Sequence, residues 1–148
     1  LDYNKFQIFS IYSNADPGSK EIIKQIKKAK FNLVKNIVSD EFINLMKYSN
    51  LLIGNSSCGI REAPSFKLPV INIGSRQNKR LRAKNVIDVD HNVNEIKNAL
   101  NYALNNKKFK KILKKVKNPY GDGYSSDKIV KILKNINLSK ITNKVISY

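Results

Sequence analysis

The chain has 148 residues, 41% of them hydrophobic, which is enough for one globular domain with a buried core. A single cysteine and a single histidine exclude an internal disulfide and a metal site built from His and Cys. The formal charge of +17 suggests a nucleic-acid partner, but the basic residues are nearly all lysines spread along the whole chain, so we expect no nucleic-acid binding.

Two further features bound the class of protein. No apolar run approaches the length of a membrane-spanning segment, and the N-terminus shows no signal-peptide pattern. We therefore expect a cytoplasmic protein without a membrane partner. The chain begins with Leu1 and enters a strand-like segment almost at once, which suggests a piece of a longer protein.

Short apolar segments alternate with amphipathic segments along the chain. Strands are expected at residues 6–12, 31–38, 51–53, 69–73 and 85–89. Helices are expected to begin at Ser19, at Ser39 or Asp40, at Ser57, after Asn92, near Phe109, and at Ser125 or Ser126. This alternation predicts an α/β fold, a parallel sheet with helices on both faces. Residues 1–137 are predicted to form one domain and residues 138–148 a tail.

The segment Leu51–Gly74 reads as a strand, a turn of small polar residues, a helix and a second strand. Backbone N–H groups at a helix start lack partners and the helix dipole favours negative charge, so the turn is predicted to bind an anion such as a phosphate. The spacing leaves open whether Ser56 and Ser57 bind that anion or only cap the helix. Glu62 is explained equally well as a favourable charge near the helix start and as an acceptor for a ribose diol.

The chain has only four arginines: Arg61, Arg76, Arg80 and Arg82. In a chain that otherwise uses lysine, their clustering has two explanations: a need for planar forks that bind phosphate or carboxylate, or chance. Arg76 is either a phosphate contact or part of a solvated loop, and Asn14 either contacts a ligand or stabilises its own turn. Because ligands bind at the carboxyl ends of parallel strands, the loops 13–18, 54–57 and 74–83 are expected to converge on one ligand.

Four motifs occur in order: Asn14-Ala15-Asp16-Pro17-Gly18, Ile53–Ala63 with its Gly-Asn-Ser-Ser run, Pro69–Gln77 with its Arg-Gln pair, and Tyr120-Gly121-Asp122-Gly123. Together they resemble the UDP-N-acetylglucosamine 2-epimerases, in particular the hydrolysing branch of the sialic-acid pathway. The resemblance implies two Rossmann-like domains of the glycosyltransferase-B type with the active site between them. This chain resembles the C-terminal, UDP-binding domain.

The resemblance also implies roles for single residues. Ser56 and Ser57 would bind the diphosphate, Glu62 the ribose hydroxyls and Arg76 a phosphate. Asn14 would contact the nucleotide region, and Ile37 would contact uracil through its backbone. Lys67 and Lys79 stand where the family usually has Gly, which puts the two turns in question.

The family reaction begins with proton abstraction at sugar C2 and continues with elimination of UDP; in the hydrolysing branch, water then gives free N-acetylmannosamine. The catalytic carboxylates and histidine of the family have no counterpart in this chain, so we expect it to bind UDP or UDP-N-acetylglucosamine without catalytic residues, metal or cofactor of its own. The expected partners are the missing N-terminal domain and, as a candidate, a second copy of the chain. The alternatives are half of a related glycosyltransferase and a non-catalytic basic binding module.

Overall fold

The computed structural model describes residues 5–12, 18–29 and 31–137. In chain order the elements are β1 (Phe9–Ile11), α1 (Ser19–Lys28), β2 (Asn32–Val34), α2 (Ser39–Tyr48), β3 (Leu52–Gly54), α3 (Cys58–Arg61), the 3₁₀ helix η2 (Ala63–Phe66), β4 (Val70–Ile73), β5 (Val86–Val89), α4 (Val93–Asn105), α5 (Lys107–Lys114) and α6 (Ser125–Asn135). The strands and helices expected from the sequence are present, and the strands are shorter than expected. The predicted tail, 138–148, lies outside the described residues.

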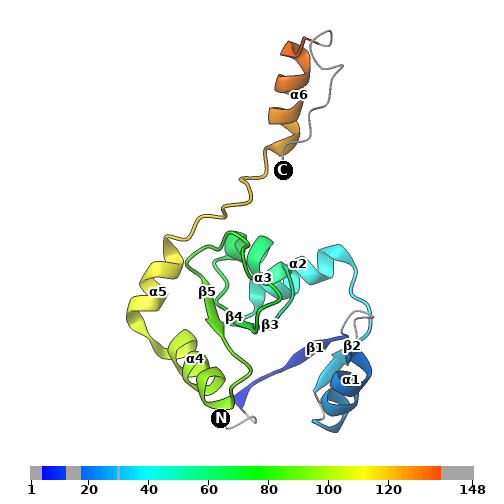
Figure 1. Ribbon diagram of the computed structural model, residues 1–148, viewed down its shortest axis with the longest axis vertical. Helices are drawn as coiled ribbons and strands as arrows, with labels where there is room; N and C mark the ends of the chain where they lie inside the picture. Colours follow the sequence, from blue (N-terminus) through cyan, green and yellow to red (C-terminus); the bar gives the residue numbers. More distant parts are fainter. Residues whose placement is uncertain (1–4, 13–17, 30, 138–148) are drawn as a thin grey trace.

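The strands form two parallel sheets (Figure 1), whereas the alternating pattern predicts one. The first sheet pairs β1 with β2, and the second has the order β3-β4-β5. In the described part of the chain no strand pairs with the outer edge of β3, where Ile53 is 48% exposed. A parallel sheet is stabilised by covering both faces, and the first sheet, whose strands bury no residue, lacks that cover.

The core surrounds β4, the middle strand of the second sheet. Val70 packs on one face with Met46 of α2 and Ala63 of η2. On the other face of this sheet, Ile87 of β5 packs against a cluster formed by α4 and α5. The second sheet therefore has helices on both faces, as the sequence predicts. We call residues 39–116 the central unit.

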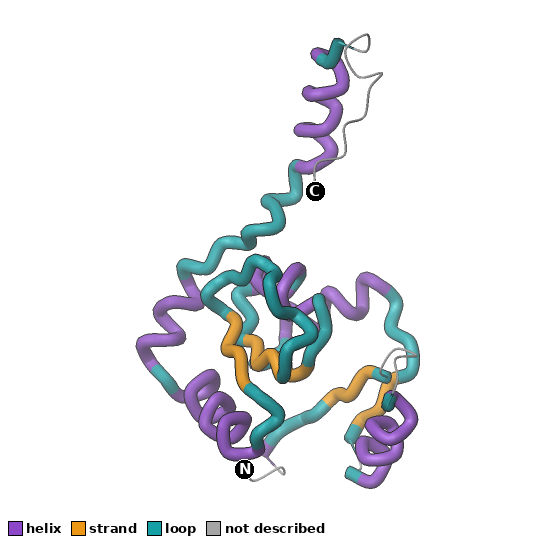
Figure 2. Tube along the Cα trace, in the orientation of Figure 1, coloured by secondary structure: helices purple, strands orange, loops and turns teal. Residues whose placement is uncertain are grey.

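Two arms flank the central unit. The N-terminal arm comprises β1, α1 and β2, and the C-terminal arm comprises residues 117–137 (Figure 2). None of the described residues in either arm is buried, and α6 stands clear of the central unit. None of the described helices is long and apolar enough to cross a membrane.

Helix caps were only partly predictable. The Asn92 side chain accepts the backbone N–H groups of Asn94 and Glu95, at 2.9 and 3.1 Å, and so caps α4 as expected. Three other helices begin at the serines expected from the sequence, Ser19, Ser39 and Ser125. The sequence also suggests a serine or aspartate cap for each, and this is wrong: Gly18, Val38 and Tyr124 occupy the cap positions, without a capping side chain.

Candidate functional site

The carboxyl ends of β3, β4 and β5 meet at one edge of the second sheet, as parallel strands require. The chain leaves this edge through Gly54, the last residue of β3, and Gly74, the residue after β4. Gly74 has a φ of 74°, and its N–H donates to Val89 at 2.8 Å. This left-handed backbone conformation favours glycine, and the ring of His91 lies so close that a Cβ at this position would be 2.3 Å from its Cε1. His91, which follows β5, thus lies beside this edge.

The turn after β3 presents the two predicted serines. Ser56 is exposed, and its Oγ accepts the N–H of Cys58 at 3.4 Å. Ser57 is half-buried and occupies the cap position of α3 without a capping hydrogen bond from its side chain. The hydroxyl of Ser57 is therefore not used as a cap, which leaves it available to a ligand.

The helix expected from Ser57 to Phe66 is interrupted. Four residues of α-helix are followed by the 3₁₀ helix η2, with Pro64 in its first turn. Proline has no N–H and cannot continue the α-helical hydrogen bonds, which accounts for the break. A four-residue helix has a small dipole, so an anion at this turn would be bound by local N–H and hydroxyl groups instead.

Glu62 lies at the junction of α3 and η2, half-buried. Its Oε2 is buried and has no hydrogen-bond partner among the described residues. An unpaired buried acceptor costs about 1–3 kcal/mol, more when charged, so the site is improved by any ligand that donates to this oxygen. A diol is such a ligand.

Cys58 lies between the serines and Glu62 but is not a nucleophile. Burial raises the pKa of its thiol, and the nearby Glu62 carboxylate raises it further, against the opposing hydrogen bond with Ser56. The thiol is protonated at neutral pH, and only thiolates attack readily.

The loop after β4 is fastened to the turn after β3. Arg76 is exposed, whereas the next residue, Gln77, is only 3% exposed. The Nε2 of Gln77 donates to the backbone oxygen of Asn55 at 2.7 Å. This contact brings the Arg76 loop next to the serine turn, as the sequence predicts for loops 54–57 and 74–83. Gln77 belongs to the Arg-Gln pair of the third motif, but its burial and its contact with Asn55 were not predicted, because the whole loop is polar.

Arg82 has a structural role. Its Nε lies 2.9 Å from Oδ2 of Asp88, and its Nη1 donates to the backbone oxygen of Arg80. Asp88 also accepts a hydrogen bond of 2.7 Å from buried Asn72. Arg82 therefore binds a carboxylate of the protein itself, through Nε alone.

The late Tyr-Gly-Asp-Gly motif begins beside the site. Nδ2 of Asn118 donates to the backbone oxygen of Arg61 at 2.8 Å and to Oγ of Ser65 at 2.7 Å. The hydroxyl of Tyr120 donates to the backbone oxygen of Leu81 at 3.1 Å. The start of the C-terminal arm thus contacts both the α3–η2 segment and the Arg76 loop.

The remaining predicted residues lie elsewhere. Ile37 is half-buried and follows β2 in the N-terminal arm, and no hydrogen bond of the described residues joins it to the serine turn. Asn14 lies outside the described residues. In the described ranges no group of three or more His, Cys, Asp or Glu side chains is arranged to hold a metal ion.

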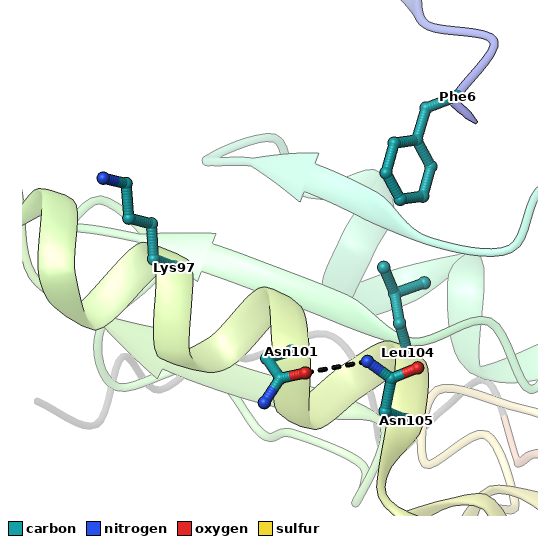
Figure 3. A pocket seen from close by; sticks show the side chains of 5 residues that line it. All are labelled: Phe6, Lys97, Asn101, Leu104 and Asn105. Atoms are coloured by element: carbon teal, nitrogen blue, oxygen red, sulfur yellow. Dashed lines mark hydrogen bonds between the residues drawn. The ribbon is translucent and has the colours of Figure 1, made fainter. Parts of the chain in front are cut away.

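A hollow of about 390 Å³ lies between the N-terminal segment and α4 (Figure 3). Phe6 and Leu104 point toward each other across it, and Lys97, Asn101 and Asn105 complete its lining. None of the predicted site residues lines it. Because no strand-end loop contributes to it, this hollow is separate from the candidate site.

The chain matches the UDP-N-acetylglucosamine 2-epimerase family over residues 1–134. It is 42% identical to the "UDP-N,N'-diacetylbacillosamine 2-epimerase (hydrolyzing)" of Legionella pneumophila, over 96% of this chain and 38% of that protein. It is 47% identical to the "GDP/UDP-N,N'-diacetylbacillosamine 2-epimerase (hydrolyzing)" of Campylobacter jejuni, over 89% of this chain and 35% of that protein. The chain thus spans under two fifths of the length of these relatives.

Two solved structures share the fold. One is the S. aureus MnaA–UDP complex, with a TM-score of 0.68, 24% identity, and coverage of 93% of this chain and 38% of that one. The other is the UDP-GlcNAc 2-epimerase of Neisseria meningitidis bound to UDP-GlcNAc, with a TM-score of 0.67, 24% identity, and coverage of 90% and 38%. They confirm the expected parallel α/β fold. The chain therefore belongs to the UDP-N-acetylglucosamine 2-epimerase family.

Proposed function

We propose that this chain is the UDP-binding part of a hydrolysing UDP-N-acetylglucosamine 2-epimerase, which releases UDP and N-acetylmannosamine. The observation that carries the proposal is the unpaired, buried Oε2 of Glu62, four residues after Cys58 in the α3–η2 segment. Family membership and the hydrolysing relatives support it. The UDP in one neighbouring structure and the UDP-GlcNAc in another support the choice of nucleotide.

In the proposed complex different site residues contact different parts of the nucleotide. Hydroxyls of Ser56 and Ser57 donate to the diphosphate, and the guanidinium of Arg76 pairs with a phosphate. Glu62 accepts hydrogen bonds from the ribose hydroxyls and so gains the donor it lacks. Asn14 contacts the nucleotide region, and Ile37 contacts uracil through its backbone.

This arrangement acts on the leaving group. When the C1–O bond breaks, negative charge grows on the diphosphate, and donors already aimed at it lower the barrier. Removal of the C2 proton requires a positioned base, which we place in the part of the protein outside this chain. We therefore expect the 148-residue chain to bind UDP and to release no N-acetylmannosamine by itself.

A sugar other than N-acetylglucosamine is a specific alternative for the substrate. The relatives that are 42% and 47% identical are named for nucleotides of N,N'-diacetylbacillosamine, a different sugar from N-acetylglucosamine. The name of the second relative also includes GDP as the nucleotide. The candidate site described above contacts the nucleotide, so it does not discriminate between these sugars. Binding assays that compare UDP with GDP show which of the two nucleotides the chain prefers.

Calorimetric titration with UDP and with 2′-deoxy-UDP tests the proposal. The unmodified chain is expected to bind UDP more tightly than the deoxy analogue, because Glu62 accepts from the 2′ hydroxyl. Glu62→Gln is expected to weaken UDP binding roughly tenfold and to remove the discrimination between the two ligands.

Glu95→Gln is the matched control. Glu95 is an exposed carboxylate that accepts a backbone N–H from Asp90 beside the same sheet edge. Its replacement is expected to leave UDP affinity unchanged. Failure of the unmodified chain to bind millimolar UDP, or equal binding of UDP and its deoxy analogue, would contradict the proposed function.

A further inference from the structure

Gln77 is a buried amide that joins two loops of the candidate site. Its side chain is 3% exposed, and its Nε2 donates to the backbone oxygen of Asn55 at 2.7 Å. Its Oε1 is buried without a hydrogen-bond partner among the described residues. A buried amide with one unsatisfied atom is costly, so packing alone does not favour this residue here.

The hydrogen bond between Gln77 and Asn55 lies where it can affect ligand binding. Asn55 directly precedes Ser56 and Ser57, while Gln77 directly follows Arg76. The amide of Gln77 therefore links the two chain segments that are proposed to hold the diphosphate, beyond the point where β3 and β4 stop pairing. The loop is also tight at this point, because the N–H of Asn78 donates to the oxygen of Ser75 at 2.9 Å.

Asn85 provides a natural comparison. It is fully buried, its Nδ2 donates to the backbone oxygen of Leu68 at 2.8 Å, and its Oδ1 is buried without a partner in the described chain. This second amide has the same chemistry, but it lies just before β5, at the amino-terminal edge of the sheet. The two residues differ in what they join, and only Gln77 joins elements of the candidate site.

We propose that Gln77 is a positioning residue: its amide holds the Arg76 loop against the Asn55–Ser57 turn, so that both segments face the same diphosphate. The inference rests on the proposed function and adds a residue to it. Gln77 contacts Asn55, and it acts on the nucleotide through the two segments that it joins. Loss of this hydrogen bond is therefore expected to weaken the binding of a ligand that contacts both segments.

The test compares UDP with UMP in calorimetric titrations of three forms of the 148-residue chain: unmodified, Gln77→Met and Asn85→Leu. Both substitutions keep the size of the side chain and remove one buried amide. Gln77→Met is expected to weaken UDP binding roughly tenfold and UMP binding much less, because UDP spans both segments. Asn85→Leu is expected to change the melting temperature by a similar amount while leaving the ratio of UDP to UMP affinity unchanged.

A second substitution, Gln77→Glu, keeps the experiment decisive if Gln77→Met does not fold. Ionised, the introduced carboxyl cannot donate to the backbone oxygen of Asn55; protonated, it can. The ratio of UDP to UMP affinity, relative to the unmodified chain, is expected to fall at alkaline pH and to recover on acidification. Circular dichroism at each pH verifies that the chain is folded.

The outcomes separate the two proposals. If the unmodified chain does not bind UDP, the proposed function is overturned and this inference with it. If the unmodified chain binds UDP but Gln77→Met and Asn85→Leu have equal ratios of UDP to UMP affinity, only the positioning role is overturned. A reduced ratio confined to the Gln77 variants supports it.

Discussion

The central unit and the two arms differ in how much apolar surface they bury. In the central unit Ile60, Ala63 and Ile71 are fully buried. In the arms none of the described residues is buried, and apolar side chains such as Phe9 and Leu133 are 44% and 60% exposed. Since burial of apolar surface is the main driving force of folding, the central unit is expected to carry most of the stability of the chain.

This difference divides the candidate site as well. Four predicted residues, Ser56, Ser57, Glu62 and Arg76, lie in the central unit. They are proposed to bind the diphosphate and ribose, and a packed core determines the geometry of this part of the site. Ile37, proposed for the base, lies in the N-terminal arm. The phosphate side of the site is therefore expected to be better organised than the base side.

The largest expected effect comes from the same substitution in a strand of each sheet. Ile71 of β4 is 0% exposed, whereas Ile11 of β1 is 39% exposed. Ile71→Ala leaves a cavity in the core and is expected to reduce the free energy of unfolding by about 2–5 kcal/mol. Ile11→Ala is expected to cost much less, because its side chain is already partly in water. Urea denaturation followed by circular dichroism measures both.

The difference between the two substitutions is the informative quantity. Equal losses of stability would mean that the N-terminal arm packs as tightly as the central unit in solution. An unchanged denaturant midpoint for Ile11→Ala would support the conclusion that the N-terminal arm is less stable than the central unit.

A smaller effect is expected from the ion pair that secures the Arg76 loop. Arg82 is 21% exposed in its side chain and pairs with Asp88, which is 49% exposed. Arg82→Ala is expected to reduce stability by about 1 kcal/mol, less at high salt, because a partly exposed ion pair is screened. Arg80→Ala, in the same loop and exposed, is the control and is expected to have almost no effect. Thermal melts at low and high salt measure the difference.

The sequence predicted local structure well where the determining residues lie within one turn of each other. Asn92 caps α4 through N–H groups two and three residues away. Lys67 and Lys79, which occupy usual glycine positions of the family, have φ values of 55° and 65°. They adopt the left-handed conformation that glycine prefers, so the turns are preserved with lysine in place. Pairing of β1 was not predictable in this way, because it depends on which distant strand edge accepts it.

The site was predictable only where motif and local geometry coincide. Ser56, Ser57 and Glu62 belong to one continuous segment, so their proximity follows from the chain. Gln77 and Asn118 contact backbone atoms 22 and 57 residues away, respectively. Such contacts arise from tertiary packing, which no local residue pattern encodes. A buried amide in a polar loop has the same sequence signal as an exposed one.

The smallest expected effect concerns an ion pair in the C-terminal arm. The carboxylate of Asp122 accepts hydrogen bonds from Lys128, at 2.9 and 3.0 Å, and from the N–H of Tyr124, at 3.2 Å. The Lys128 contact, followed by the backbone N–H, lowers the pKa of Asp122 below its ordinary value of 3.8. A lowered pKa stabilises the folded form above the ordinary value, and this stabilisation is lost as the pH falls through the lowered pKa.

Lys128→Gln tests this in a region without a buried core. The pKa of Asp122, followed by NMR titration, is expected to rise toward its ordinary value, as it also should in high salt. Global stability is expected to stay unchanged, because both side chains of the pair are exposed and none of the described residues in its arm is buried. A loss of global stability comparable to that of Arg82→Ala would mean that the C-terminal arm folds as one unit with the central unit. The arm would then have to bury apolar side chains such as Leu133 against the rest of the protein, contrary to the distinction between the two regions.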